Sequence, residues 1–214
     1  MHSRICFVQR IIFAKMEGSL FLELSNDAGL IATVILTFNF LLGMMLSTEY
    51  KKKLYWKRLP EYIRQINVNN LHNWTAYVAL VSVLLHPVFL LFDPLAKFNF
   101  IDVIFPISAP HQKLMVAFGT VAMFAIITVI ITTQKTIKKK MSFRAWKNIH
   151  LVSYCTAFLF VIHGIMLDPQ LKDNPVDFFD GEKLVPELCG LILIAATIFR
   201  YKYHLKSKKK NLNR

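Results

Sequence analysis

The chain has few cysteines, and they form no motif. Its 214 residues include only three, Cys6, Cys155 and Cys189. No two of them form a C-x-x-C pair, so the sequence contains neither a cysteine-based zinc site nor the C-x-x-C-H motif that attaches haem covalently. Cys155 and Cys189 lie in apolar stretches, where a cysteine usually serves as a small packing residue.

Glycine and acidic residues are also scarce. There are 7 glycines, and 13 Asp and Glu against 26 Lys and Arg, while 55% of the residues are hydrophobic. The mean hydropathy is +0.42. This composition lies outside the range of ordinary soluble domains and predicts an integral membrane protein.

Apolar stretches of about 20 residues, the length that a helix needs to cross the hydrocarbon core, recur five times. We expect helices at residues 28–47, 73–92, 114–134, 148–167 and 184–203. The fifth is the most polar, but its charged residues lie in its first and last turns, where they can reach the interfaces. The fold class predicted is an all-α, multi-pass transmembrane helix bundle with about five spans.

The positive charges alternate along the chain. Segments 49–71, 135–149 and 200–214 hold 6, 6 and 7 Lys or Arg, whereas segments 93–113 and 168–187 hold 2 each. Basic loops stay in the cytoplasm, so we expect a protein of the cell membrane with its N-terminus outside the cell and its C-terminus in the cytoplasm. The net charge of +13 then reflects topology and contact with the lipid bilayer, and we expect no nucleic acid partner.

The N-terminal residues differ from the predicted spans. Residues 1–27 are apolar but are interrupted by Arg4, Arg10 and Lys15, which disfavours a sixth span and favours an interfacial segment. We expect a membrane domain over residues 28–204 and a basic cytoplasmic tail over residues 205–214.

Four of the seven histidines lie at matching depths in two spans. His72 and His86 belong to the second span, and His150 and His163 to the fourth. Both spans start from a basic loop and therefore run parallel, and in each the second histidine lies roughly 20 Å deeper than the first. His72 can thus face His150 at one level, and His86 can face His163 at another.

Imidazoles in hydrocarbon are costly unless they are hydrogen-bonded or coordinate a group. Neutral imidazole is a good ligand for haem iron, and a flat, apolar porphyrin fits between helices with one histidine on each side. We therefore expect two stacked b-type haems between spans two and four. Asn73, Ser82 and Asn148 are nearby polar residues that could orient the rings.

The spacing within the fourth span is unusual. Fourteen residues, as between His72 and His86, return to nearly the same face of an ideal helix, whereas the 13 residues from His150 to His163 end about 140° away. A π-bulge, an unwound turn near Gly164, or a position of His150 before the regular helix would each supply the rotation.

The chain resembles the ferric reductase-like transmembrane domain family. That family includes ferric-chelate reductases, NADPH oxidases and the haem-binding membrane subunit of the methionine sulfoxide reductase system. The resemblance covers roughly residues 28–204 and rests on H-x13-H followed two spans later by H-x12-H, on "RAWKNIH" at the start of the fourth span and on "FRYK" at 199–202. It implies an inner haem on His72 and His150 and an outer haem on His86 and His163.

The function implied is electron transfer across the membrane, from the inside outward. Only "HLKSKKKNLNR" follows the last span, without a G-x-G-x-x-G motif, so we expect FAD and NAD(P)H to act only through a separate partner. The donor is then a cytoplasmic flavin reductase or a membrane quinol, and the acceptor an external reductase, ferric iron or oxygen. Arg144 and Lys147 lie at the level of the inner haem and could pair with its propionates, or serve only as topogenic charges.

Three alternatives stay open. The chain could be a haem-binding subunit that supplies a periplasmic reductase, such as methionine sulfoxide reductase. It could be a cytochrome b that accepts electrons from quinol and is unrelated to ferric reduction. It could also be a haem-free membrane interaction protein, whose histidines form hydrogen bonds between helices and which would carry no chromophore.

Overall fold

The computed structural model describes residues 2–168, 170–171 and 183–212, and the regular structure in these residues is entirely helical. Five helices are long and apolar enough to cross a membrane. They are α1 (His2–Leu46), α4 (Val68–Phe92), α6 (Lys113–Thr133), α8 (Phe143–Met166) and α9 (Leu184–Leu212). The predicted helical bundle with five candidate spans is confirmed, and the chain is a multi-pass membrane protein.

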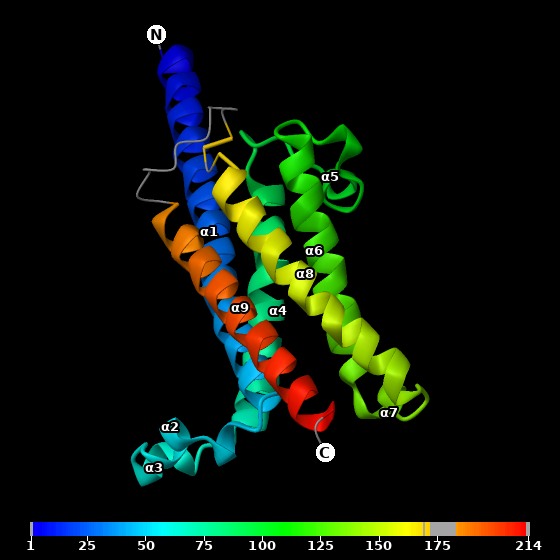
Figure 1. Cartoon of the computed structure of the whole chain (residues 1–214). Coiled ribbons are helices and arrows are strands. Elements are labelled where there is room, and N and C mark those ends of the chain that lie inside the picture. The colour runs from blue at the N-terminus through cyan, green and yellow to red at the C-terminus, as the bar shows by residue number, and fades with distance from the viewer. Residues whose placement is uncertain (1, 169, 172–182, 213–214) are drawn as a thin grey trace.

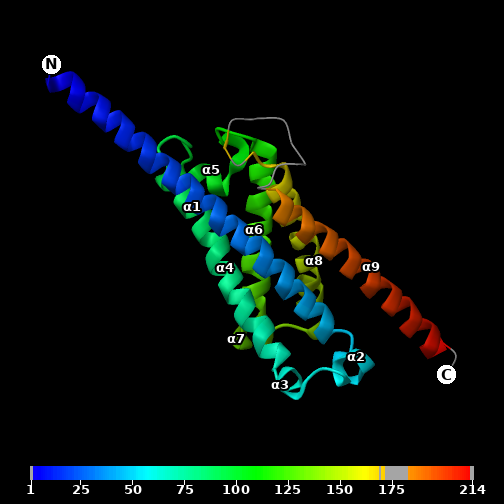
Figure 2. The ribbon, with the colours of Figure 1, turned by 90° about the vertical axis from the view of Figure 1, so that its left-hand side faces the viewer.

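Short helical elements join the long ones. They are η1 (Tyr50–Lys52), α2 (Leu54–Lys57), α3 (Glu61–Arg64), α5 (Phe100–Ile104), η2 (Pro106–Ser108) and α7 (Lys135–Lys138). The basic segments 49–71, which contains α2 and α3, and 135–149, which contains α7, lie at the same end of the bundle as the C-terminus, and α5 lies at the opposite end (Figures 1 and 2). Clustering of the basic segments at one end is what the predicted topology requires, and the orientation in the membrane stays a prediction.

Helix α1 differs from the predicted boundary at residue 28. It runs without a break from His2 to Leu46, and the stretch from Leu20 to Leu46 is apolar enough to span a membrane. The reason is that Leu20, Phe21 and Leu22 extend the apolar stretch toward the N-terminus. The start of α1 projects beyond the other helices (Figure 2), and the interfacial position of residues 1–27 stays a prediction.

Side-chain caps fix where the two histidine-bearing helices begin. The Asn67 side chain accepts a hydrogen bond from the backbone N–H of Asn70 at the start of α4. Ser142 accepts one from the backbone N–H of Ala145 at the start of α8. Such caps satisfy backbone donors that have no partner inside the helix, so each helix has a defined start upstream of its first histidine.

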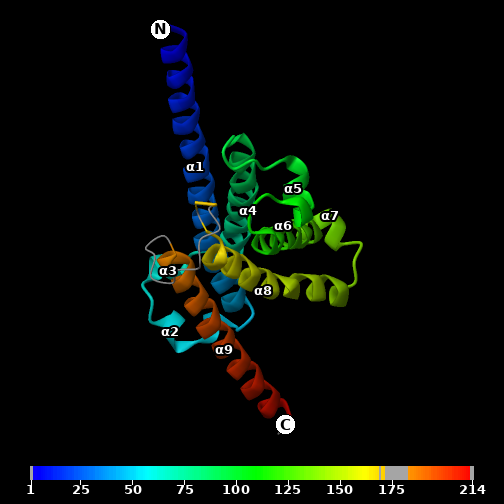
Figure 3. The ribbon, with the colours of Figure 1, turned by 90° about the horizontal axis from the view of Figure 1, so that it is seen from above.

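The long helices pack as two pairs. Helix α1 lies along α4, α6 lies along α8, and α9 packs against α1 and α8 (Figure 3). The two helices that bear the histidines, α4 and α8, are both fully described and have almost no direct backbone contact. The side chains of α4 and α8 therefore meet without a close approach of the two backbones.

A cluster of apolar side chains from α1, α4, α6 and α8 fills the middle of the bundle. Its buried members include Ala32, Val83, Met123 and Phe160. Val83 lies between the two histidines of α4 in sequence, and Phe160 lies between those of α8. This cluster therefore separates the two histidine levels by hydrocarbon.

Candidate functional site

The structure brings the four histidines together in two pairs. The ring centres of His72 and His150 lie 6.2 Å apart, and those of His86 and His163 lie 6.0 Å apart. The two planes in each pair are nearly perpendicular, at 72° and 82°. The pairing expected from the sequence is thus present, while haem ligation by these residues stays a prediction.

The 13-residue spacing in α8 is accommodated without an irregular turn. Helix α8 is α-helical from Phe143 to Met166, including His150, His163 and Gly164. A π-bulge, an unwound turn and a histidine ahead of the helix are therefore all wrong as explanations. Instead, α8 runs obliquely to α4 (Figures 1 and 3), so the side of α8 that faces α4 changes along its length.

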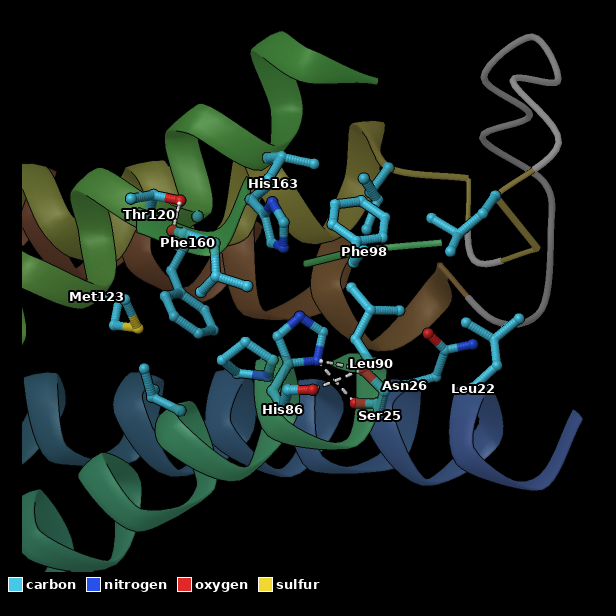
Figure 4. A pocket seen from close by; sticks show the side chains of 17 residues that line it. Leu22, Ser25, Asn26, His86, Leu90, Phe98, Thr120, Met123, Phe160 and His163 are labelled. Carbon is cyan, nitrogen blue, oxygen red and sulfur yellow. Dashed lines mark hydrogen bonds between the residues drawn. The ribbon is translucent and has the colours of Figure 1, made fainter. Parts of the chain in front are cut away.

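His86 is fixed to α1 by Ser25. The backbone carbonyl of Ser25 lies 2.8 Å from His86 Nδ1, and Ser25 Oγ lies 3.1 Å from the same nitrogen. Ser25 Oγ also donates to the backbone carbonyl of His86 at 2.8 Å. Figure 4 shows these bonds beside the facing ring of His163. Ser25 is 1% exposed, so these hydrogen bonds are shielded from solvent.

Two more rings bond to backbone carbonyls of a neighbouring helix. His163 Nδ1 lies 2.7 Å from the carbonyl of Met115 on α6, and His72 Nδ1 lies 3.1 Å from the carbonyl of Asn39 on α1. The Asn39 amide donates in turn to the His72 carbonyl and to Thr75 Oγ1. Since a carbonyl only accepts, Nδ1 carries the proton in these rings, which leaves the Nε2 lone pair available to a metal.

Each of these three rings also packs directly against a glycine of the neighbouring helix. The pairs are His72 with Gly43, His86 with Gly29 and His163 with Gly119. A Cβ added at Gly119 would lie 2.8 Å from His163 Cε1, and one added at Gly29 would lie 3.0 Å from His86 Nδ1. Three of the seven glycines thus allow the rings to lie close to the adjacent backbone.

His150 has different surroundings. Its Nδ1 is buried without a hydrogen-bond partner among the described residues, and so is Nε1 of Trp146. The two rings are stacked, with centres 5.3 Å apart and planes at 19°. His150 is therefore held by its own helix, whereas the other three rings are held by a neighbour.

A cavity opens around the outer pair. It contains about 700 Å³ of space, part of which is open to the surroundings, and its lining includes His86 and His163 (Figure 4). Most of the other lining residues are apolar, among them Val83, Leu90 and Phe160. A mostly apolar lining with a few polar groups is typical of cofactor pockets.

The geometry of the pairs fits a metal that is held from two sides. A bond between imidazole nitrogen and a metal is about 2.0–2.1 Å long, so two opposed imidazoles on one metal have ring centres about 6 Å apart. No group of three or more His, Cys, Asp or Glu in the described part of the chain could hold a bare metal ion. Two histidines suit an iron whose remaining ligands come from a porphyrin, so the residues fit haem.

The other predicted site residues do not contact the histidine rings in the structure. Arg144 and Lys147 are exposed in the first turns of α8, and their pairing with propionates stays a prediction. Ser82 Oγ bonds to the Val78 carbonyl of its own helix, and the rings are oriented by other groups. Sequence reasoning missed those groups because backbone carbonyls carry no side-chain signal, although Ser25 and Asn39 are visible as polar residues in an apolar helix.

A comparison with known families gives one match. The model of the ferric reductase like transmembrane component matches residues 28–162. This range includes His72, His86 and His150 and ends one residue before His163. No curated protein and no solved structure matches the chain.

Proposed function

Because this chain belongs to the ferric reductase-like transmembrane component family, we propose that it transfers electrons across the membrane through two b-type haems. His72 and His150 hold the inner haem, and His86 and His163 hold the outer haem. Support comes from the two opposed imidazole pairs, with ring centres 6.2 and 6.0 Å apart. Both pairs lie between helices that have almost no direct contact.

Haem supplies one-electron redox chemistry, while the chain supplies binding, orientation and a low dielectric. The carbonyls of Ser25, Asn39 and Met115 accept from Nδ1 of three rings. These bonds fix the orientation of the rings and make each Nε2 a better electron donor. The mostly apolar walls of the outer cavity give the site a low dielectric.

The basic end of the bundle is the cytoplasmic end, and the N-terminus lies outside. His72 and His150 are then near the cytoplasm, where a flavin reductase or a membrane quinol delivers electrons. The Lys and Arg residues around α2, α3 and α7 suit an acidic surface on a soluble donor. An external reductase, ferric iron or oxygen accepts the electrons at the opposite end.

The haem-free alternative is less consistent with the ring nitrogens. The hydrogen bonds to His72, His86 and His163 all use Nδ1. Nε2 of these rings has no hydrogen-bond partner in the described part of the chain. Histidines that serve only to join helices would be expected to satisfy both nitrogens, so the free Nε2 atoms favour a metal ligand.

The absorption spectrum of the purified protein tests the proposal. We expect two b haems per chain by pyridine haemochrome assay, with low-spin bands in the dithionite-reduced protein. His86→Ala should lose the outer haem and His150→Ala the inner one, because each removes one of two axial ligands. His204→Ala, an exposed histidine in α9, is the matched control and should retain both haems. A colourless protein from haem-replete cells would refute electron transfer and favour the interaction-protein alternative.

A further inference from the structure

Trp146 supports the His150 ring by stacking on its face, whereas carbonyls support the other three rings through Nδ1. It lies one helical turn before His150 on α8, and its indole is stacked on the imidazole. The glycines that contact histidine rings face His72, His86 and His163. The orientation of the His150 ring therefore depends on stacking rather than on a hydrogen bond to a neighbouring helix.

The same tryptophan carries a buried donor that lacks an acceptor. Its Nε1 is inaccessible and makes no hydrogen bond to any described residue. An N–H group left in this state costs roughly 1–3 kcal/mol, and unsatisfied buried donors are rare enough in native proteins to need an explanation. An acceptor that does not belong to the described residues is the natural partner of this N–H.

A positive charge beside the indole indicates what kind of acceptor it is. Lys138 Nζ lies 3.8 Å from the centre of the Trp146 ring, so an ammonium group and an unpaired N–H lie together at the inner histidine pair. A hydrogen bond from a neutral donor becomes stronger when the acceptor is ionised. The N–H of Trp146 and the ammonium group of Lys138 together favour an anionic acceptor. A haem between His72 and His150 would carry such an anion, the carboxylate of its propionate.

We propose that Trp146 Nε1 and Lys138 Nζ form a carboxylate-binding site for a propionate of the inner haem, and that the indole positions His150 by stacking. This proposal rests on the proposed function, because it takes His72 and His150 as the ligands of that haem. It assigns the propionate to two residues other than Arg144 and Lys147, the pair that the sequence analysis singled out.

The two contributions of Trp146 can be separated by substitution. Trp146→Phe retains an aromatic face for His150 but removes the N–H, whereas Trp146→Ala removes both. Trp74→Phe is a matched control, because Trp74 is 70% exposed and lies near the inner end of α4. The measurements are the haem content per chain and the propionate-bending band in the resonance Raman spectrum of the purified full chain.

We expect Trp146→Phe to retain two haems per chain and to shift the propionate band. Lys138→Gln should shift the same band, and Trp74→Phe should leave it unchanged. Trp146→Ala should lower the haem content from two toward one per chain, because His150 loses its support. This pattern would assign the carboxylate to the indole N–H and the ring position to the stack.

An unchanged propionate band in Trp146→Phe would overturn the carboxylate site. If the indole fluorescence of the wild-type chain also differed between nanodiscs of neutral lipid and nanodiscs of anionic lipid, the anion would be a lipid phosphate. That result too would contradict the proposal. Two unperturbed haems in Trp146→Ala would overturn the positioning of His150. A wild-type chain without haem is a separate result, because it refutes the proposed function itself.

Discussion

Among the glycines that contact histidine rings, Gly119 leaves the least room for a side chain. A Cβ there would lie 2.8 and 2.9 Å from Cε1 and Nδ1 of His163, and the ring is held against this backbone by its bond to the Met115 carbonyl. The histidine cannot move away without losing that bond. Gly119 is therefore as much a part of the outer site as the histidine that it faces.

We expect Gly119→Ala to displace His163 and to lower the haem content from two toward one per chain. Overpacking of this kind destabilises a protein by about 1–3 kcal/mol, which a lower thermal unfolding midpoint would reveal. Gly164→Ala is the control, since its Cβ would lie 3.5 Å from Pro186, an ordinary contact. If Gly119→Ala retained both haems and its unfolding midpoint, the close approach of the ring would not matter to the site.

The hydrogen bonds of the histidines show where residue-level prediction succeeds and where it fails. The pairing of His72 with His150 and of His86 with His163 follows from charge-defined topology and the 1.5 Å rise of a helix. The acceptors of Nδ1 could not be predicted, because a main-chain carbonyl is the same at every residue. The stack of Trp146 on His150 was not predicted either, although a spacing of four residues places the two side chains on one helix face.

Helix α8 is the element whose geometry the sequence predicted least well. Its apolar length identified it as a span, but the 13-residue spacing of its histidines suggested a distortion. The structure instead has a regular helix that crosses α4 obliquely. A crossing direction depends on contacts with several other helices, here α6 and α9, and cannot be read from the periodicity of α8 alone.

A single alanine inserted after Tyr154 tests this crossing geometry. It lengthens the spacing between His150 and His163 to that of α4 and turns one ring by about 100° relative to the other. We expect one haem to be lost, as measured by pyridine haemochrome, because the oblique crossing requires the shorter spacing. An alanine inserted after Leu167, beyond both histidines, is the control. If the variant with the insertion after Tyr154 retained both haems, the angle between His150 and His163 around the axis of α8 would not matter for haem binding.

At the scale of the whole molecule, three basic segments gather at one end of the bundle. The apolar runs predicted the five candidate spans correctly, because span length follows from the thickness of the bilayer rather than from details of packing. The topology inferred from the alternation of charge agrees with this arrangement and stays a prediction. The part of α1 before residue 28 was not predicted as a continuation of the span, since Arg4, Arg10 and Lys15 interrupt its apolar residues, yet the helix is continuous from His2.

Labelling of introduced cysteines tests the orientation in the membrane. In a variant without Cys6, Cys155 and Cys189, we expect Lys97→Cys to react with a membrane-impermeant maleimide in intact cells. Lys139→Cys should react only after the cells are permeabilised, because α7 and its neighbours carry the positive charge that is retained inside. The reverse pattern would place the basic end outside and would invert the direction of electron flow.

Because α4 and α8 have so little direct contact, assembly of the bundle is expected to depend on the cofactor. The pairs α1–α4 and α6–α8 are each well packed, whereas α4 and α8 have almost no direct backbone contact, and a mostly apolar cavity lies at His86 and His163. A haem bound between α4 and α8 would connect the pair α1–α4 to the pair α6–α8. Insertion of haem would then be the last step of assembly, and the supply of haem would set how much of the chain escapes the proteases that remove unfinished membrane proteins.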